Sequence, residues 1–362
     1  MKKSFKYLLK QSLPLIVVLT VVFVSIYDLS CLLSNCHYEY VPYAEYLSYP
    51  DATIYEIVIM LSIASAVIPI INFGRYKNKN AVDVYFSLPL TKNSFYAQKL
   101  IIGFIAILIP FTISYFIGLF ILLARQADFY MLQYLPLYFL LVIGSLFMYI
   151  ICSFFVIKAN NVVDSIIFIV LFTLITSIMM DSLNRFIYLF IEKSNIIDWR
   201  FDYLFAPYSS LYHINIYYKF LLKTKMPNYS FSNQSVYIFS MVVALIVNFV
   251  FAALSLVGIF IHIKKMKNED AEERSKTWFG YKTMIPILFT IVLMQINWST
   301  NFVNYFLLSA VYIVSYIVLT MAAEFRSVRI DKSRYITLIS IYAIYTVIYF
   351  IAGFDIFGFK IK

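Results

Sequence analysis

Side chains able to do chemistry are sparse along these 362 residues, and their spacing suits no common catalytic or metal site. The three histidines, His37, His213 and His262, lie far apart, without the short spacings of metal ligands. No Gly-x-Ser-x-Gly motif occurs, and no glycine-rich loop ends in Lys-Ser or Lys-Thr. We therefore expect no catalytic residues, no metal, no cofactor and no ATP hydrolysis in this chain itself.

The most informative spacing lies in a hydrophilic stretch, residues 73–99, between two apolar runs. Its basic residues come first, directly after the apolar run, and they are Arg75, Lys77 and Lys79. Thr91 is suited to cap a new helix, whose first turns continue into the next apolar run. Basic residues beside apolar runs are also typical of any cytoplasmic membrane loop, so composition alone assigns no function.

A short amphipathic element is expected in the middle of this stretch, at residues 81–88. Asp83 lies near its start, and the residues available for one apolar face are Val82, Tyr85, Phe86 and Leu88. Pro89 ends the element, because proline lacks an amide hydrogen and disfavours a helical residue before it. The pattern therefore predicts an element that lies parallel to the membrane between two spans.

The whole composition places these elements in a membrane. The chain is 62% hydrophobic and 13% charged, whereas a soluble domain has roughly a quarter charged residues. Apolar runs of about 20 residues predict an all-α, multi-pass membrane protein with about nine spans, eight to ten at the limits. They are expected at residues 13–34, 53–73, 98–124, 132–157, 161–181, 236–262, 280–297, 303–324 and 335–354.

The net charge of +10 follows the same topology. With the N-terminus in the cytoplasm and the C-terminus outside, most of the 29 Lys and Arg residues fall on the cytoplasmic side. We therefore expect membrane lipids with anionic headgroups, and no nucleic acid, as the partner of this charge.

The predicted organisation has four parts. They are an interfacial helix at residues 1–12, a six-span core at 13–262, a mixed-charge linker at 263–279 and three further spans at 280–362. The core includes the cytoplasmic segment 74–97 and an external loop, 182–235. This loop is too apolar for a free linker and too short for its own core, so we expect it to lie on the membrane, with an interfacial helix at 208–225.

The order of features in residues 75–99 resembles the coupling segment of type-2 ATP-binding-cassette permeases. Basic residues are followed by Asp83 and Tyr85, then by Ser87, Leu88 and Pro89, then by Thr91, Lys92 and Lys99. In that family the segment lies between the second and third spans, as it does here, and docks on a cytoplasmic ATPase subunit. The resemblance implies an ATPase-coupling interface formed by Asp83, Tyr85, Phe86, Leu88, Pro89 and Leu90.

The end of the chain resembles a Ytr-like subgroup of these permeases, which carries extra C-terminal spans. The closing motif here has Asp355, Phe357 and Gly358 followed by an aromatic residue. Longer members continue into an external domain, and this chain has Lys360 where they tend to carry an acid. The resemblance implies an exporter subunit in the cell membrane, paired with an ATPase subunit and a second permease copy or paralogue. A hydrophobic or amphipathic cargo, such as a peptide, an antimicrobial or a lipid-like molecule, suits a chain this rich in Phe and Tyr.

Two other classes stay open. A membrane sensor or anchoring partner that transports nothing would show similar spans without needing an ATPase. A secondary transporter is less well supported, because such proteins show ionisable groups at mid-bilayer and two structural repeats. Asp28 is the one acid placed well inside a predicted span, and it lies toward the outer end.

Overall fold

The structure, a computed structural model, describes residues 2–33, 39–41, 44–46, 51–77, 91–125, 131–188, 203–223, 234–265, 275 and 281–294, with short helical pieces between 313 and 347. The chain forms two compact units. Unit 1 comprises Met1–Ile166 and Pro207–Arg274, and unit 2 comprises Ile167–Ala206 and Ser275–Lys362.

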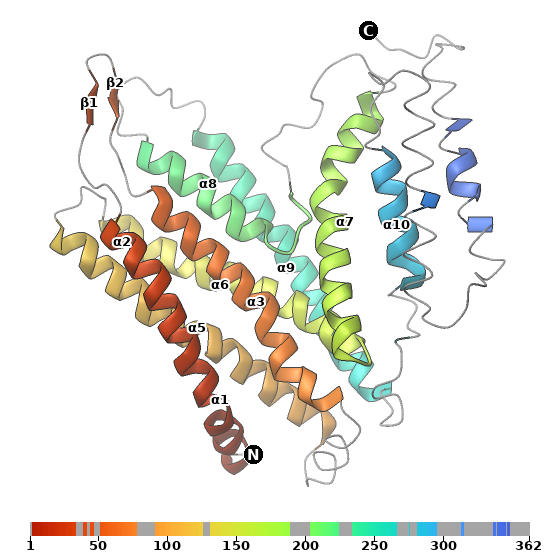
Figure 1. The fold of residues 1–362 in the computed structure, drawn as a ribbon, viewed down its shortest axis with the longest axis horizontal. Helices are drawn as coiled ribbons and strands as arrows, with labels where there is room; N and C mark the ends of the chain where they lie inside the picture. Colours follow the sequence, from red (N-terminus) through yellow and green to blue (C-terminus); the bar gives the residue numbers. More distant parts are fainter. Residues whose placement is uncertain are drawn as a thin grey trace. The chain divides into compact units, whose positions relative to one another are not determined.

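Unit 1 is built almost entirely of helices (Figure 1). Its elements are α1 (Lys2–Phe23), the π-helical turn η1 (Val24–Asp28), α2 (Leu29–Leu33), β1 (Glu39–Val41), β2 (Ala44–Tyr46), α3 (Asp51–Gly74), the 3₁₀ turn η2 (Arg75–Lys77), α5 (Lys92–Ala124), α6 (Met131–Lys158), the first turn of α7 (Val162–Tyr188), α8 (Ser209–Lys223) and α9 (Gln234–Lys265). The two strands pair as one antiparallel ribbon, with Tyr40 opposite Glu45. Apart from this ribbon, the described elements confirm the predicted helical fold.

Six helical stretches in the described residues are long and apolar enough to cross a membrane. They are Ser4–Leu33, Ile54–Gly74, Lys92–Ala124, Tyr134–Lys158, Val162–Leu183 and Val236–Lys265. These stretches coincide with the first six predicted spans. Of the other three, the span at 280–297 overlaps α10 (Tyr281–Met294) in unit 2. Only residues 313 and 314 of the span at 303–324 are described, and half of the span at 335–354 is described, as short helical pieces at 336–337, 339–344 and 346–347.

The outer faces of these helices are apolar. Exposed side chains include Val17, Val18 and Val21 on α1, and Phe239, Ile246, Phe249 and Leu254 on α9. Contiguous apolar surface of this kind is rare on soluble monomers. A helix also satisfies its backbone hydrogen bonds internally, as a hydrocarbon solvent requires. The outer faces therefore support a membrane location.

Close helix packing inside unit 1 places aromatic rings against glycines. α1 lies along α5, and α6 packs against α3 and α9 (Figure 1). A Cβ atom at Gly118 would lie 2.3 Å from the Tyr27 ring, and one at Gly258 would lie 2.7 Å from the Phe154 ring. Glycine at these positions thus permits close approach between helices, as small residues do in membrane bundles.

The N-terminal residues are continuous with the first span. α1 stays helical through Pro14 and passes directly into η1 and α2. Residue 12, the predicted end of a separate interfacial helix, is therefore not a helix boundary. Membrane helices tolerate an internal proline where the freed backbone groups find other partners. Lys6 and Lys10 consequently lie on the same helix as the first span.

An interfacial helix is expected at residues 208–225. α8 (Ser209–Lys223) forms there and lies against other helices, and its place relative to the membrane surface stays a prediction. It packs on α9, α6 and α3 (Figure 1), and Leu211 and Ile214 are fully buried. Its polar Ser209 is also buried, and its Oγ accepts a hydrogen bond from Asn248 Nδ2 at 2.7 Å.

Unit 2 contains the rest of α7 and α10. α7 continues to Tyr188, past the predicted end of the fifth span and into the predicted loop 182–235. The predicted linker 263–279 is described only at residues 263–265 and at Ser275, and the closing motif lies outside the described residues.

Candidate functional site: the frame of loop 78–90

The predicted coupling interface lies outside the described residues. This applies to Asp83, Tyr85, Phe86, Leu88, Pro89 and Leu90. The structure does describe both ends of the loop that carries them, because η2 ends at Lys77 and α5 begins after Thr91. The candidate site is therefore the loop frame, defined as residues 72–77, 91–103 and 156–165.

Thr91 ends the loop and caps α5. Its backbone is extended, with φ −68° and ψ 142°, and its side chain accepts a hydrogen bond from Ser94 N at 3.4 Å. Its carbonyl oxygen accepts the first helical bond, from Phe95 N at 3.0 Å. This geometry confirms the predicted N-cap, whose hydroxyl satisfies an amide that the helix itself leaves unpaired.

Lys77 holds the other end of the loop. Its side chain is only 5% exposed. Its Nζ lies within hydrogen-bond distance of four oxygens between the end of α6 and the start of α7. These are the carbonyls of Val156, Ala159 (2.8 Å) and Asn161 (3.4 Å) and the hydroxyl of Ser165 (2.5 Å). The lysine therefore links η2 to the turn between α6 and α7, across about 80 residues of sequence.

The charge of Lys77 is balanced by protein and not by solvent. Burial lowers the pKa of Lys77 to about 7, and the nearby carboxylate of Asp164 opposes that shift. The last carbonyls of α6 carry partial negative charge, because the helix itself leaves them unpaired. Asn161 Oδ1 accepts from Asp164 N at 2.7 Å, so the same turn also caps α7.

Aromatic side chains join the two ends of the loop. Phe73 stacks on Tyr96 with 5.8 Å between ring centroids, and Tyr76 meets Phe95 edge-on at 5.1 Å. Lys99 Nζ lies 5.1 Å from the centroid of the Tyr76 ring, in cation–π range. All five side chains are buried. They form one packed contact between the end of α3 and the start of α5.

α6 connects α3 and α5 one turn deeper in the bundle. Asn72 Nδ2 donates to the Lys99 carbonyl at 2.7 Å, and Tyr149 Oη on α6 donates to the Leu100 carbonyl at 3.0 Å. A Cβ atom at Gly103 would lie 2.1 Å from Tyr149 Oη. The loop frame is thus held by side chains from three helices.

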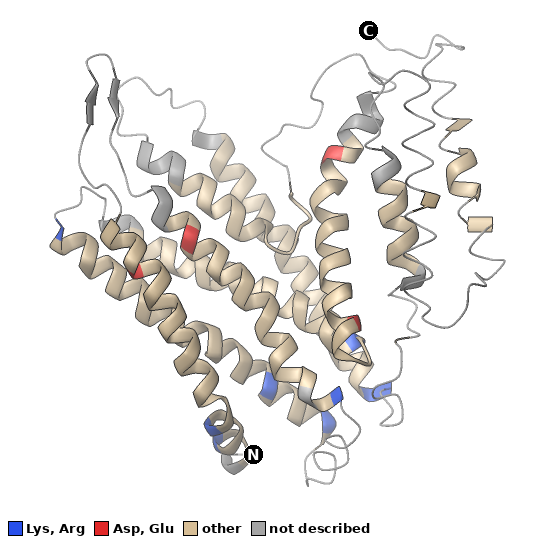
Figure 2. Ribbon diagram, in the orientation of Figure 1, with Lys and Arg blue, Asp and Glu red and all other residues tan. Residues whose placement is uncertain are grey.

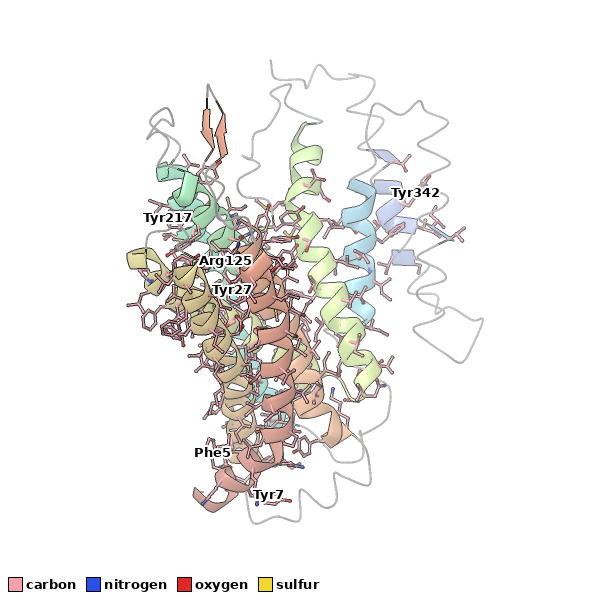
Figure 3. The ribbon with its side chains drawn as sticks, turned by 60° about the vertical axis from the view of Figure 1, so that its left-hand side comes forward. Phe5, Tyr7, Tyr27, Arg125, Tyr217 and Tyr342 are labelled. Carbon is pink, nitrogen blue, oxygen red and sulfur yellow. The ribbon has the colours of Figure 1, made fainter. Side chains whose placement is uncertain are left out.

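Positive charge gathers at this end of unit 1, as Figure 2 shows. The lysines of unit 1 whose side chains the structure describes lie on α1, in η2, in the first two turns of α5 and in the last turns of α6 and α9, and they are Lys6, Lys10, Lys77, Lys92, Lys99, Lys158, Lys264 and Lys265. Arg125 lies at the opposite end from Phe5 and Tyr7 (Figure 3). Within the described part of unit 1, the loop frame therefore occupies the strongly basic end.

A second polar group lies at the opposite end, beside Tyr27 (Figure 3). Asp28 ends the π-helical turn and is 4% exposed. Its Oδ1 accepts a long hydrogen bond from Ser114 Oγ, at 3.4 Å, and its Oδ2 has no hydrogen-bond partner among the described residues. Cys31 follows Asp28 by three residues, and its carbonyl accepts a hydrogen bond from Arg125 Nη1 at 2.8 Å. Ionisable groups inside spans, and π-helical turns, are often found at functional sites.

Comparison with known proteins identifies no relative. No family model, curated protein or solved structure matches this chain. Among the described residues, no group of three or more His, Cys, Asp or Glu side chains could hold a metal ion.

The sequence indicated the role of Thr91 and missed that of Lys77. Lys77 was interpreted as one of three basic topology residues, and nothing local points to oxygens so far away in sequence. One signal was present, because Phe73, Tyr76 and Lys77 share a face at helical spacing. A basic residue that continues an apolar face is a candidate for burial.

Proposed function

We propose that this chain is the permease subunit of an ATP-binding-cassette exporter in the cell membrane. Its N-terminus lies in the cytoplasm, and ATP is hydrolysed by a separate subunit that docks on loop 78–90. The cargo is a hydrophobic or amphipathic molecule, and a second permease, either a copy or a paralogue, completes the pathway. The chain needs no cofactor of its own.

The observation that carries this proposal is the loop frame. A loop that only obeys membrane topology needs no fixed ends, because solvent satisfies its polar groups. Here both ends are fixed, with Thr91 capping α5 and Lys77 donating to oxygens of α6 and α7. A loop held in this way can pass an applied displacement into the helices that hold it.

The charge distribution supports the orientation. The basic end of unit 1 carries the loop frame, and positively charged ends of spans favour the cytoplasm. A loop on that side is accessible to a cytoplasmic ATPase.

The test is co-purification of the tagged full-length chain from its native host in mild detergent. The wild-type chain should recover a stoichiometric ATPase. The double variant Phe86→Asp with Leu88→Asp should lower that recovery about ten-fold or more, because charge on an apolar docking face loses more than 1.4 kcal/mol of binding.

The matched control is Asn78→Asp with Asn80→Asp, which adds the same charge to polar positions of the same loop. It should recover the ATPase nearly as well as the wild type. A wild-type chain that comes without any ATPase would contradict the proposal and favour a sensor or anchoring partner.

A further inference from the structure

We propose that Lys77 is a positioning residue that transmits displacement of loop 78–90 to the turn between α6 and α7. This inference rests on the proposed function, because it assigns a second route for the force that the ATPase applies. Thr91 provides the first route, directly into α5.

The position of Lys77 leaves no free chain between the loop and its anchor. It is the last residue of η2, and loop 78–90 follows at once. Its Nζ contacts four oxygens in 156–165, and its side chain is buried. A displacement of residue 78 therefore acts first on a side chain that is bonded to the α6–α7 turn.

Capping of α6 alone does not account for this arrangement. α6 already has a basic residue, Lys158, in its own last turn. Burying a second ammonium group is unfavourable unless good geometry and an opposite charge compensate. The Lys77 site offsets part of this cost, with four oxygens around Nζ and Asp164 nearby. The consequence is a specific connection between segments far apart in sequence.

The two routes lead to different helices. The cap at Thr91 and the Phe73 and Tyr76 contacts connect the loop with α3 and α5. The Lys77 hydrogen bonds lead elsewhere, from the end of η2 to the carbonyls of α6 and the first turn of α7. Without Lys77, loop displacement should still move the start of α5 and should move the α6–α7 turn much less, because only the packing of α6 against α3 and α5 would then carry it.

The test uses two fluorescent reporters in the purified permease–ATPase complex. Native cysteines are replaced by alanine, and an environment-sensitive label is attached at Asn160→Cys in the α6–α7 turn or at Asn93→Cys in the first turn of α5. Both positions are partly exposed. The change in fluorescence on adding ATP is measured for each reporter in the wild-type and Lys77→Met backgrounds.

The expected result is selective. Lys77→Met should keep ATPase recovery and the signal at residue 93, while the signal at residue 160 falls about five-fold or more, the scale of a typical coupling free energy. Lys10→Met, which removes an exposed charge from α1 at the same end, should leave both signals unchanged. Equal signals at residue 160 in Lys77→Met and wild type would overturn the inference.

One further variant and one control separate failure of this inference from failure of the proposed function. If Lys77→Met does not fold, Ser165→Ala removes one of the four oxygens and should still weaken the signal at residue 160 more than the signal at residue 93. An equal effect of Ser165→Ala on both signals would also overturn the inference. Failure of the wild-type chain to recover an ATPase contradicts the proposed function itself, whereas a normal complex with a normal Lys77→Met signal contradicts only the role of Lys77.

Discussion

At the scale of single residues, Lys77 makes stability depend on pH. Its pKa is about 7 in the folded chain and 10.5 ordinarily, so between these values the unfolded chain binds more protons. Stability should therefore rise with pH across that interval. In detergent between pH 7 and 9, the melting temperature should rise more steeply with pH for wild type than for Lys77→Met. The opposite slope would mean that the four oxygens and Asp164 raise the pKa of Lys77 by more than burial lowers it.

Asp28 is the second residue whose environment makes a prediction. One of its carboxylate oxygens is buried without a hydrogen-bond partner in the described part of the chain. Because an unpaired buried charge is unfavourable, Asp28→Asn should leave the melting temperature unchanged or raise it by a few degrees. Asp164→Asn is the comparison, and it should lower the melting temperature because it removes the charge beside buried Lys77. A large loss of stability in Asp28→Asn would indicate that a cation or donor binds this carboxylate.

At the scale of elements, the contact of α5 with α6 depends on Gly103. A Cβ atom there would lie 2.1 Å from Tyr149 Oη and 2.8 Å from Asn72 Nδ2. Tyr149 is held by its bond to the Leu100 carbonyl, so Gly103→Ala should destabilise the protein by about 1–3 kcal/mol. Thermal unfolding of Gly103→Ala, Tyr149→Phe and the double variant measures the coupling. The double variant should be more stable than the sum of the single losses predicts, and strict additivity would contradict the steric explanation.

Elements differ in how far the sequence alone could predict them. The first six spans and the Thr91 cap follow from local rules, because apolar run length and a threonine before a helix carry the signal within a few residues. The burial of α8 could not be predicted in this way, since its tyrosines and lysines are typical of an interface and its partners lie on three other helices. The four oxygens around Lys77 are equally non-local. The proposed docking residues, Asp83 to Leu90, stay a prediction.

At the scale of the whole molecule, charge and apolar surface together predict an orientation for unit 1. The helices expose valine, isoleucine, leucine and phenylalanine along their length, while lysines gather at the end that carries the loop frame. In a bilayer, lipid chains cover apolar helix surfaces, and anionic headgroups attract clustered lysines. The orientation therefore decides whether loop 78–90 can meet an ATPase at all.

Cysteine labelling in intact cells tests this orientation. In the cysteine-free chain, Ala124→Cys at the end of α5 should react with a membrane-impermeant maleimide, whereas Lys10→Cys should react only after permeabilisation. Both side chains are exposed in the structure, so a difference in reactivity reports the side of the membrane and not burial. Because α1 and α5 are packed along each other within unit 1, the two reporters test one and the same orientation. The reverse pattern would place loop 78–90 outside the cell, where no cytoplasmic ATPase could bind it, and would therefore contradict the permease proposal without any knowledge of the cargo.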